Sequence, residues 1–341
     1  MIDALGKLVR RESLTEAEAA RAMETIMAGD ATPSQIAGFI VALRVKGETV
    51  EEITGLARTV RAHATPMQAP ADVLDVVGTG GDGLGTFNIS TLAAIVAAAC
   101  GVPVAKHGNR AASSLCGSAD VLEALGVKID LGPEGVGRCI EEAGIGFMFA
   151  PVFHPSFKYA AVPRRELGVR TVFNILGPLC NPAQAPFQAL GVAEAGLADR
   201  VVEVLSRLGV KRVLVFHAAD GMDELSVAGP SRVLEILDGK RAEYQLDPGA
   251  LGLARADPGA VRGGSPAENA AIAREVLAGA PGPRREVVLL NAAAALRAAG
   301  RAGDWQEGLE LAARAIDKGA AGEVLDRWIG VSQSAAAPAP A

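Results

Sequence analysis

The chain has 341 residues, of which 50% are apolar, 21% are charged and 4% are aromatic, and its formal net charge is −6. This length and apolar content suffice for one large core or for two domains. An acidic balance without a basic stripe, together with few aromatic side chains, argues against a nucleic-acid-binding protein, which needs clustered cations and stacking surfaces.

The N-terminal residues and the cysteines indicate a cellular compartment. The first residues do not show the charged, apolar and small-residue pattern of a signal peptide, and no apolar run approaches the roughly 20 residues that cross a bilayer. We therefore expect a cytoplasmic protein without membrane contact. The cysteines do not have the spacing of a metal site, so we expect reduced and mostly buried thiols. They are Cys100, Cys116, Cys139 and Cys180.

Residues 1–64 are predicted to form a small all-helical domain. Thr15, Thr32 and Thr49 each precede a glutamate or glutamine by three positions, which is the pattern of a capping box at a helix start. Apolar residues follow each cap at helical spacing. Residues 65–70 contain two prolines and indicate a linker. We expect helices from about residues 163–182 to join this domain.

From residue 71 to about residue 330, strand and helix patterns alternate. This alternation predicts an α/β domain with a mainly parallel sheet covered by helices. Asp238 and Gly239 between two strand-like runs predict a hairpin, and hence antiparallel strands at one edge. The alanine- and proline-rich residues 332–341 are predicted to form a disordered tail. Strands are expected at 73–77, 102–105, 127–129, 145–149, 187–192, 213–216, 233–237 and 241–246, and helices at 92–100, 118–125, 134–143, 197–208 and from 265 onward.

One stretch, residues 73–91, carries the strongest functional signal. A short β-branched strand gives way to five glycines within residues 78–85 and then to a buried helix whose start Asn88 or Ser90 caps. Glycine allows the backbone to approach a ligand closely, and a helix start offers N–H groups to an anion. The spacing matches neither a Rossmann nor a Walker loop. A plain structural turn would need one polar cap at most, whereas several polar side chains flank this one, so we favour a phosphate cradle.

Polar side chains also follow the next strand, at the edge of a parallel sheet where ligands collect. Residues 106–114 hold two cations, an imidazole, an amide and two hydroxyls, which favours a phosphate or sugar site over solvated surface. His107 can equally serve as a structural hydrogen-bonding group. Ser118 starts another helix and offers a second place for an anion.

Arginines and an acidic pair complete the set. Segment 158–174 carries several arginines. They are either surface charges, or one of them binds a substrate carboxylate through two parallel hydrogen bonds. Asp223 and Glu224 follow the strand at 213–216 and are either a solvated turn or a site for a divalent cation. A helix dipole contributes about 0.3–2 kcal/mol toward an anion, whereas a close charge pair contributes about 4 kcal/mol at an intermediate dielectric. Because a polyphosphate carries several charges, this comparison favours magnesium.

A series of motifs resembles those of anthranilate phosphoribosyltransferase, in the same order along the chain. The resemblance extends from the first helices to about residue 330 and implies a homodimeric enzyme of tryptophan biosynthesis. It also implies transfer of the phosphoribosyl group of 5-phosphoribosyl 1-pyrophosphate to the amine of anthranilate, giving N-(5-phosphoribosyl)anthranilate and pyrophosphate. The motifs occupy residues 78–82, 88–91, 106–110, 117–123, 164–171, 174–179 and 223–224.

The resemblance also implies roles for individual residues. Ser156 and Phe157 stand where relatives often carry a small residue and methionine, so the resemblance does not define the shape of the acceptor entrance. Catalytic roles are implied for Lys106, Asn109 and Arg164, contacts with anthranilate for Gly78, Asn109 and Arg164, and two magnesium ions per subunit at Ser90, Asp223 and Glu224. Contacts with 5-phosphoribosyl 1-pyrophosphate are implied for Gly78, Gly81, Asp82, Thr86, Asn88, Ile89, Ser90, Thr91, Lys106, His107, Gly108, Asn109, Arg110, Ala111, Ala112, Ser113, Ser114 and Ser118.

The implied reaction is a displacement at the anomeric carbon, and it needs no strong general base because an aromatic amine is largely unprotonated near neutral pH. Lys106, backbone N–H groups and magnesium would stabilise the leaving pyrophosphate, while Asn109 and Arg164 would hold the acceptor in line. Two alternatives remain open. The Asn109 and Arg164 motifs argue against a pyrimidine nucleoside phosphorylase of the same fold. The acidic charge and the acidic pair argue against a non-catalytic, nucleic-acid-binding relative.

Overall fold

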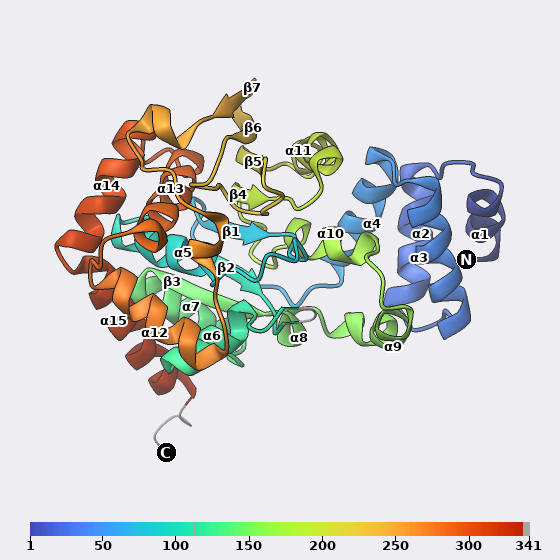
Figure 1. Cartoon of the computed structure of the whole chain (residues 1–341). Coiled ribbons are helices and arrows are strands. Elements are labelled where there is room, and N and C mark those ends of the chain that lie inside the picture. Colours follow the sequence, from blue (N-terminus) through green and yellow to red (C-terminus); the bar gives the residue numbers. More distant parts are fainter. Residues whose placement is uncertain (112–113, 337–341) are drawn as a thin grey trace, which may run out of the picture.

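The computed structural model of the chain describes residues 1–111 and 114–336. A bundle of helices from the start of the chain stands beside a larger unit in which helices cover a sheet (Figure 1). Within the described residues, no helix combines the length and the apolar character needed to span a membrane. The four cysteines are free thiols and three of them are buried, as predicted.

The N-terminal bundle begins its helices where the sequence predicts. The side chains of Thr15, Thr32 and Thr49 each accept the N–H of the residue three positions on, whose own side chain accepts the threonine N–H. These exchanges satisfy two main-chain donors at each helix start and thereby fix where the helix begins. The helices are α1 (Ile2–Val9), α2 (Glu16–Met27), α3 (Pro33–Lys46) and α4 (Val50–Ala62).

The larger unit is built on a seven-stranded sheet with the order β3-β2-β1-β4-β5-β6-β7. The first five strands in this order are parallel, so their carboxyl ends meet at one edge, while β6 and β7 pair antiparallel. The predicted hairpin is confirmed, with Asp238 and Gly239 at φ 52° and 78°. The strands are β1 (Leu74–Gly78), β2 (Val104–Gly108), β3 (Ile145–Phe149), β4 (Phe187–Gly191), β5 (Arg212–Ala218), β6 (Ser231–Leu237) and β7 (Lys240–Leu246).

Helices cover both faces of the sheet, which confirms the predicted fold class. Val77 of β1 belongs to the apolar cluster shared with the bundle and α11 (Ala198–Arg207), whereas its neighbour Val76 belongs to the cluster beneath the other helices. At the outer edge, Lys240, Arg241 and Glu243 of β7 are exposed. The other helices of this unit are α5 (Ile89–Ala99), α6 (Ser118–Leu125), α7 (Pro133–Ala143), α8 (Ala150–Phe153), α12 (Pro266–Leu277), α13 (Pro283–Ala298), α14 (Trp305–Asp317) and α15 (Ala320–Ala336).

Two helices from the middle of the chain, α9 (Lys158–Leu167) and α10 (Val172–Leu179), pack against the N-terminal bundle (Figure 1). Phe173 and Leu176 of α10 belong to the same buried apolar cluster as Phe39 of α3. Because α9 follows β3 and α10 precedes β4, the chain passes from the sheet to the bundle and back. Arg170, in the connection between α9 and α10, donates to the carbonyl of Gly80 just after β1, so this connection lies near the carboxyl end of β1.

Two predictions about the course of the chain are wrong. Residues 127–129 form no strand, because the N–H of Lys128 donates to Ser332 Oγ of α15 at 3.0 Å. Two alternating apolar residues are too short a pattern to separate a strand from a buried loop. Helix α15 continues to Ala336 with Ser332 fully buried, so residues 332–336 are not disordered. The alanines there favour helix. The rest of the predicted tail, residues 337–341, lies outside the described residues.

Candidate active site

A cavity of about 690 Å³ lies at the carboxyl ends of β1 and β2. The glycine loop that follows β1, the loop that follows β2 and the two acidic residues after β5 all line it. Arg170, between α9 and α10, and Asn174 of α10 close it from the side of the bundle. Segments that are far apart in the sequence thus meet in one polar cavity.

The glycine loop after β1 owes its composition to two separate constraints. Gly80, Gly81, Gly83 and Gly85 adopt φ values of 68°, 74°, 76° and 64°, which residues with a side chain rarely adopt. Gly78 is required for a different reason, since a Cβ atom there would collide with the carboxylate of Asp223. The glycines of this loop therefore line the cavity with main chain alone.

Asp223 and Glu224 are buried, and each accepts a main-chain N–H, one from the glycine loop and one from the start of α5. The Gly80 N–H donates to Asp223 Oδ2 at 2.5 Å, and the Ser90 N–H donates to Glu224 Oε1 at 3.1 Å. Burial, together with the charge of Asp82, raises the pKa of Asp223 to about 7. Burial and the neighbouring Asp223 raise the pKa of Glu224 to about 8. The start of α5, predicted to attract an anion, thus already holds a carboxylate of the chain itself.

The start of α5 is capped differently from the prediction. Asn88 occupies the N-cap position, but its side chain makes no capping hydrogen bond. Its amide instead donates to the Cys116 carbonyl at 3.2 Å and accepts from Asn269 at 2.9 Å. Asn88 therefore ties the glycine loop to the segment before α6 and to α12.

Lys106 lies almost fully buried at the base of the cavity. Its Nζ donates to the Val76 carbonyl at 2.6 Å and to Ser90 Oγ at 3.4 Å. Burial lowers the pKa of Lys106, and the nearby carboxylates of Asp75 and Glu224 oppose that effect. Burial likewise raises the pKa of Asp75 to about 6. Lys106 is thus the cation that balances the acidic groups around the strand ends.

The acidic residues around the cavity fit a divalent cation. Asp82 Oδ2 is buried without a hydrogen-bond partner, and burial together with a neighbouring carboxylate raises the pKa values of Asp223 and Glu224. In the part of the chain that the structure describes, no group of three histidine, cysteine or acidic side chains forms a ready ligand set. Magnesium is commonly held by one or two carboxylates, with substrate phosphates and water completing its shell. Asp223 and Glu224 match that mode of binding.

An aromatic run leads from the cavity wall toward Arg164. The His107 and His154 rings lie 5.0 Å apart, Phe157 stacks on His154 at 5.2 Å, and Phe173 meets Phe157 edge-on at 5.6 Å. The Arg164 guanidinium lies 5.1 Å from the Phe173 ring, and burial lowers its pKa. Burial also lowers the pKa of His107 to about 3 and of His154 to about 4, so both imidazoles are neutral near pH 7.

Most residues expected to contact the donor line the cavity, but three of the implied site residues do not. Thr86 instead pairs with Arg262 in an isolated bridge, Ile89 is buried in the core, and Arg164 lies over Phe173. Ala112 and Ser113 lie outside the described residues. Those that line the cavity are Gly78, Gly81, Asp82, Asn88, Ser90, Thr91, Lys106, His107, Gly108, Asn109, Arg110, Ala111, Ser114, Ser118, Asp223 and Glu224.

Other lining residues were not among the implied contacts. Arg170 and Asn174 belong to segment 158–174, whose arginines fit either surface charge or binding of a carboxylate, and the packing of α9 and α10 brings these two residues to the cavity. Gly168, which ends α9 in a left-handed conformation just before Arg170, is the one local signal that the chain turns there. The further lining residues are Val77, Thr79, Gly80, Gly83, Gly85, Leu115 and Gly117.

Comparison with known proteins gives matches over almost the whole chain. Two family models match, the helical bundle domain of the glycosyl transferase family over residues 2–64 and the a/b domain of the same family over residues 70–322. Anthranilate phosphoribosyltransferase 2 of Streptomyces coelicolor is 61% identical over 316 residues, which are 92% of this chain and 94% of the relative. Anthranilate phosphoribosyltransferase of Dehalococcoides mccartyi is 54% identical over 336 residues, 98% of each chain.

Solved structures agree with this. Anthranilate phosphoribosyltransferase from Thermus thermophilus superposes with a TM-score of 0.92 at 48% identity, covering 97% of this chain and 99% of that one. The enzyme from Saccharomyces cerevisiae in complex with PRPP and Mg superposes with a TM-score of 0.90 at 30% identity, covering 98% of both chains. The chain therefore belongs to the glycosyl transferase family of the two matching models and, within it, to the anthranilate phosphoribosyltransferases.

Proposed function

We propose that the protein transfers the phosphoribosyl group of 5-phosphoribosyl 1-pyrophosphate to the amine of anthranilate and releases pyrophosphate. The observation that carries the proposal is the cavity in which a glycine loop at positive φ faces two buried carboxylates. Main-chain amides suit phosphate oxygens and carboxylates suit magnesium, so this cavity fits a metal-bound diphosphate. The relatives named for this activity, and the yeast enzyme with PRPP and Mg, support the same assignment.

In the proposed reaction the bond between the anomeric carbon and the pyrophosphate oxygen breaks, and its electron pair leaves with pyrophosphate. The amine nitrogen of anthranilate bonds to that carbon and then loses a proton to solvent. Lys106 and the N–H groups of the glycine loop stabilise the charge that gathers on the leaving group. The neutral state of His107 and His154 is consistent with a reaction that needs no charged acid beside the acceptor.

Arg164 and Asn109 are proposed to hold anthranilate. Asn109 lines the cavity, and the aromatic run from His107 ends beneath Arg164. We propose that the carboxylate of anthranilate binds the Arg164 guanidinium, which can hold it through two parallel hydrogen bonds. Gly78, at the end of β1, lines the same cavity and is proposed as a further contact of anthranilate.

Magnesium is proposed at Ser90, Asp223 and Glu224, as two ions per subunit. When bound, it would neutralise charge on the pyrophosphate. The adjacent side chains of Asp223 and Glu224 are buried, and each is held in place by a hydrogen bond from a main-chain N–H, which supports this proposal. The yeast enzyme variant solved with Mg bound supports the metal.

The proposed quaternary structure is a homodimer formed through the bundle. Exposed apolar side chains gather on α1, on α3 and around α9, where Ile2 and Val9 are 74% exposed and Val45 is 67% exposed. Val162 and Val169 add to this surface at 42% and 59%. Val45 and Val169 line one hollow together, and a contiguous exposed apolar patch often marks a protein–protein interface. Within each subunit we propose two domains, residues 1–64 with α9 and α10, and residues 71–330.

The decisive experiment measures the release of a free base in one mixture and the fluorescence of anthranilate in three others. We expect the fluorescence to fall only when enzyme, 5-phosphoribosyl 1-pyrophosphate and magnesium are all present, with mixtures lacking the donor or the metal as controls. A fourth mixture of a pyrimidine nucleoside with inorganic phosphate tests the alternative phosphorylase. Release of the free base there, without consumption of anthranilate in the complete mixture, would overturn the proposal.

A further inference from the structure

Arg170 reaches from the connection between α9 and α10 to the main chain of the glycine loop. Its Nη1 donates to the Gly80 carbonyl at 2.6 Å. The guanidinium stands so close to Gly81 that a Cβ atom at that position would collide with it. A side chain from the bundle side thus contacts the backbone of the loop proposed to bind the donor.

Gly80 is consequently held at both of its peptide groups. Its N–H donates to Asp223 Oδ2 at 2.5 Å, and its carbonyl accepts from Arg170 at 2.6 Å. In a trans peptide the carbonyl and the following N–H point in opposite directions, so the Gly81 N–H is directed away from Arg170. Glycine has access to many backbone conformations, and these two contacts select one of them.

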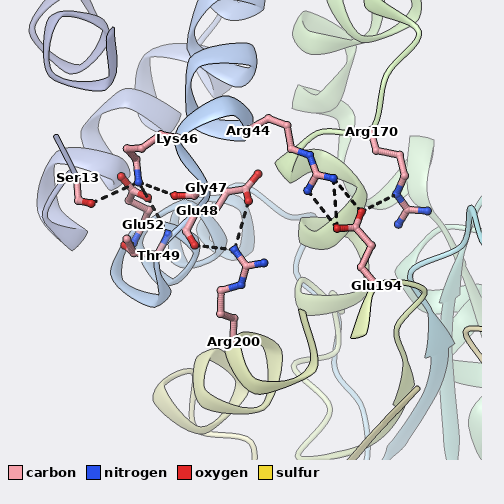
Figure 2. A network of polar contacts seen from close by, with 10 residues as sticks. All are labelled: Ser13, Arg44, Lys46, Gly47, Glu48, Thr49, Glu52, Arg170, Glu194 and Arg200. Carbon is pink, nitrogen blue, oxygen red and sulfur yellow. Dashed lines mark hydrogen bonds and ion pairs between the residues drawn. The ribbon is translucent and has the colours of Figure 1, made fainter. Parts of the chain in front are cut away.

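Glu194, which follows β4, connects Arg170 to the bundle (Figure 2). Its Oε1 lies 3.5 Å from Arg170 Nε, and the carboxylate accepts hydrogen bonds of 3.1 to 3.3 Å from both terminal nitrogens of Arg44. Arg44 belongs to the last turn of α3. The loop of Glu194 is itself fixed to the residue that follows β1, because the Ala193 N–H donates to the Thr79 hydroxyl at 3.1 Å. A continuous series of contacts therefore runs from α3 through Glu194 and Arg170 to Gly80.

We propose that Arg170 is a positioning residue for the phosphoribosyl donor and that Glu194 and Arg44 hold its guanidinium in place. The orientation of the glycine loop, and with it the KM for the donor, then depends on how the bundle docks against the sheet. This inference rests on the proposed donor site. An isolated surface ion pair contributes little to the stability of a protein. Here, however, the Arg170 guanidinium also donates a hydrogen bond to a main-chain carbonyl of the glycine loop.

The chain offers a matched control in a second contact between the same two units. Arg200 of α11 donates to the Glu48 carbonyl at 2.8 Å, and its Nη1 lies 3.5 Å from Glu48 Oε2 (Figure 2). Glu48 lies between α3 and α4. Neither residue lines the cavity. Arg200→Ala therefore removes a similar contact between bundle and sheet unit without touching the series that ends at Gly80.

The test compares KM for each substrate in Arg170→Ala, Glu194→Gln, Arg44→Ala and Arg200→Ala at saturating magnesium. Loss of a charged hydrogen bond predicts that Arg170→Ala raises the KM for 5-phosphoribosyl 1-pyrophosphate about 10- to 100-fold. Arg44→Ala removes the hydrogen bonds that hold Glu194 and should raise the KM for the donor about threefold. Arg200→Ala should leave it unchanged, and the KM for anthranilate should stay the same in all four. In a chain that already carries Arg170→Ala, the additional change Arg44→Ala should not alter the KM for the donor further.

An unchanged donor KM in Arg170→Ala, or an equal rise in Arg200→Ala, overturns the inference. Arg170→Lys keeps one charged donor and should recover part of the affinity, whereas a simple loss of packing would not be recovered. If Arg170→Ala does not fold, as judged by circular dichroism, Glu194→Gln decides the matter by the same comparison. Calorimetric titration with 5-phosphoribosyl 1-pyrophosphate and magnesium needs no turnover. If the wild-type chain binds the donor in this titration but consumes no anthranilate, the proposed function is contradicted. The donor affinities of the variants still test the role of Arg170 in that case.

Discussion

The donor side and the acceptor side of the cavity differ in the kind of side chain that they contain. On the donor side, Asp223 and Glu224 are buried acidic groups that already accept hydrogen bonds from main-chain amides of the glycine loop and of α5. On the acceptor side, His154 and Phe157 form part of a neutral aromatic run, and Arg164 rests on that run outside the cavity. On the donor side, the acidic groups are already hydrogen-bonded to the main chain. On the acceptor side, the Arg164 guanidinium lies over the ring of Phe173.

This difference matches the charges of the two proposed substrates. A polyanion and its metal ions require dipoles and charges that are fixed in advance, since reorganising them during the reaction would cost free energy. A flat aromatic acid needs apolar walls and one cation for its carboxylate. Substitutions should therefore separate into those that abolish chemistry on the donor side and those that weaken acceptor binding alone.

The largest effect is expected from Asp223→Asn combined with Glu224→Gln. The neutral amides keep the volume but remove the charge that suits magnesium, so we expect kcat/KM to fall about 1000-fold. Anthranilate should still bind, which calorimetry can measure. Turnover close to wild type at low magnesium in this variant would contradict the assignment of the acidic pair.

Arg164→Ala addresses the acceptor side. Loss of a charge-assisted hydrogen bond predicts that kcat/KM for anthranilate falls about 10- to 100-fold, while the KM for the donor is unchanged. Steady-state kinetics with either substrate varied separate the two constants. An increase in the donor KM of the same size would show that the two sides do not divide as described.

His154→Gln tests whether the acceptor side is neutral. The pKa of His154 is lowered to about 4 by burial, below its ordinary value near 6.5, so the unfolded chain binds more protons between these two values. Stability is fully present above pH 6.5 and falls as the pH drops through that window, by on the order of 2 kcal/mol at pH 5 from this residue. Thermal unfolding midpoints from pH 7.5 to pH 5 should fall less steeply in the variant. An identical slope would show that His154 is not a buried neutral group.

The smallest effect is expected from Phe173→Leu, which removes the ring beneath Arg164. A partly exposed cation–π contact contributes roughly 0.5–1 kcal/mol, so the KM for anthranilate should rise about threefold. Phe173→Tyr keeps the ring and serves as the control. Equal effects of the two variants would exclude the ring face as the support of Arg164.

Local sequence signals predicted much of the fold. The threonine caps of the bundle, the glycine run after β1 and the Asp238-Gly239 turn act within a few residues, so their structures could be anticipated. The pairing of Glu224 with the Ser90 N–H joins residues 134 positions apart and has no local signal. Arg170 likewise reaches Gly80 only because α9 and α10 pack against the bundle. Long-range packing therefore decides the details of the site that the motifs only outline.

The hairpin at the outer edge of the sheet bears on how the protein behaves at high concentration. Strand β7 leaves one row of its peptide groups without a neighbouring strand, and such a row can recruit a strand from another molecule. Lys240, Arg241 and Glu243 stand exposed along that strand. Pairing with a second edge would bring charged side chains together at short range, so β7 protects the folded chain against edge-to-edge aggregation.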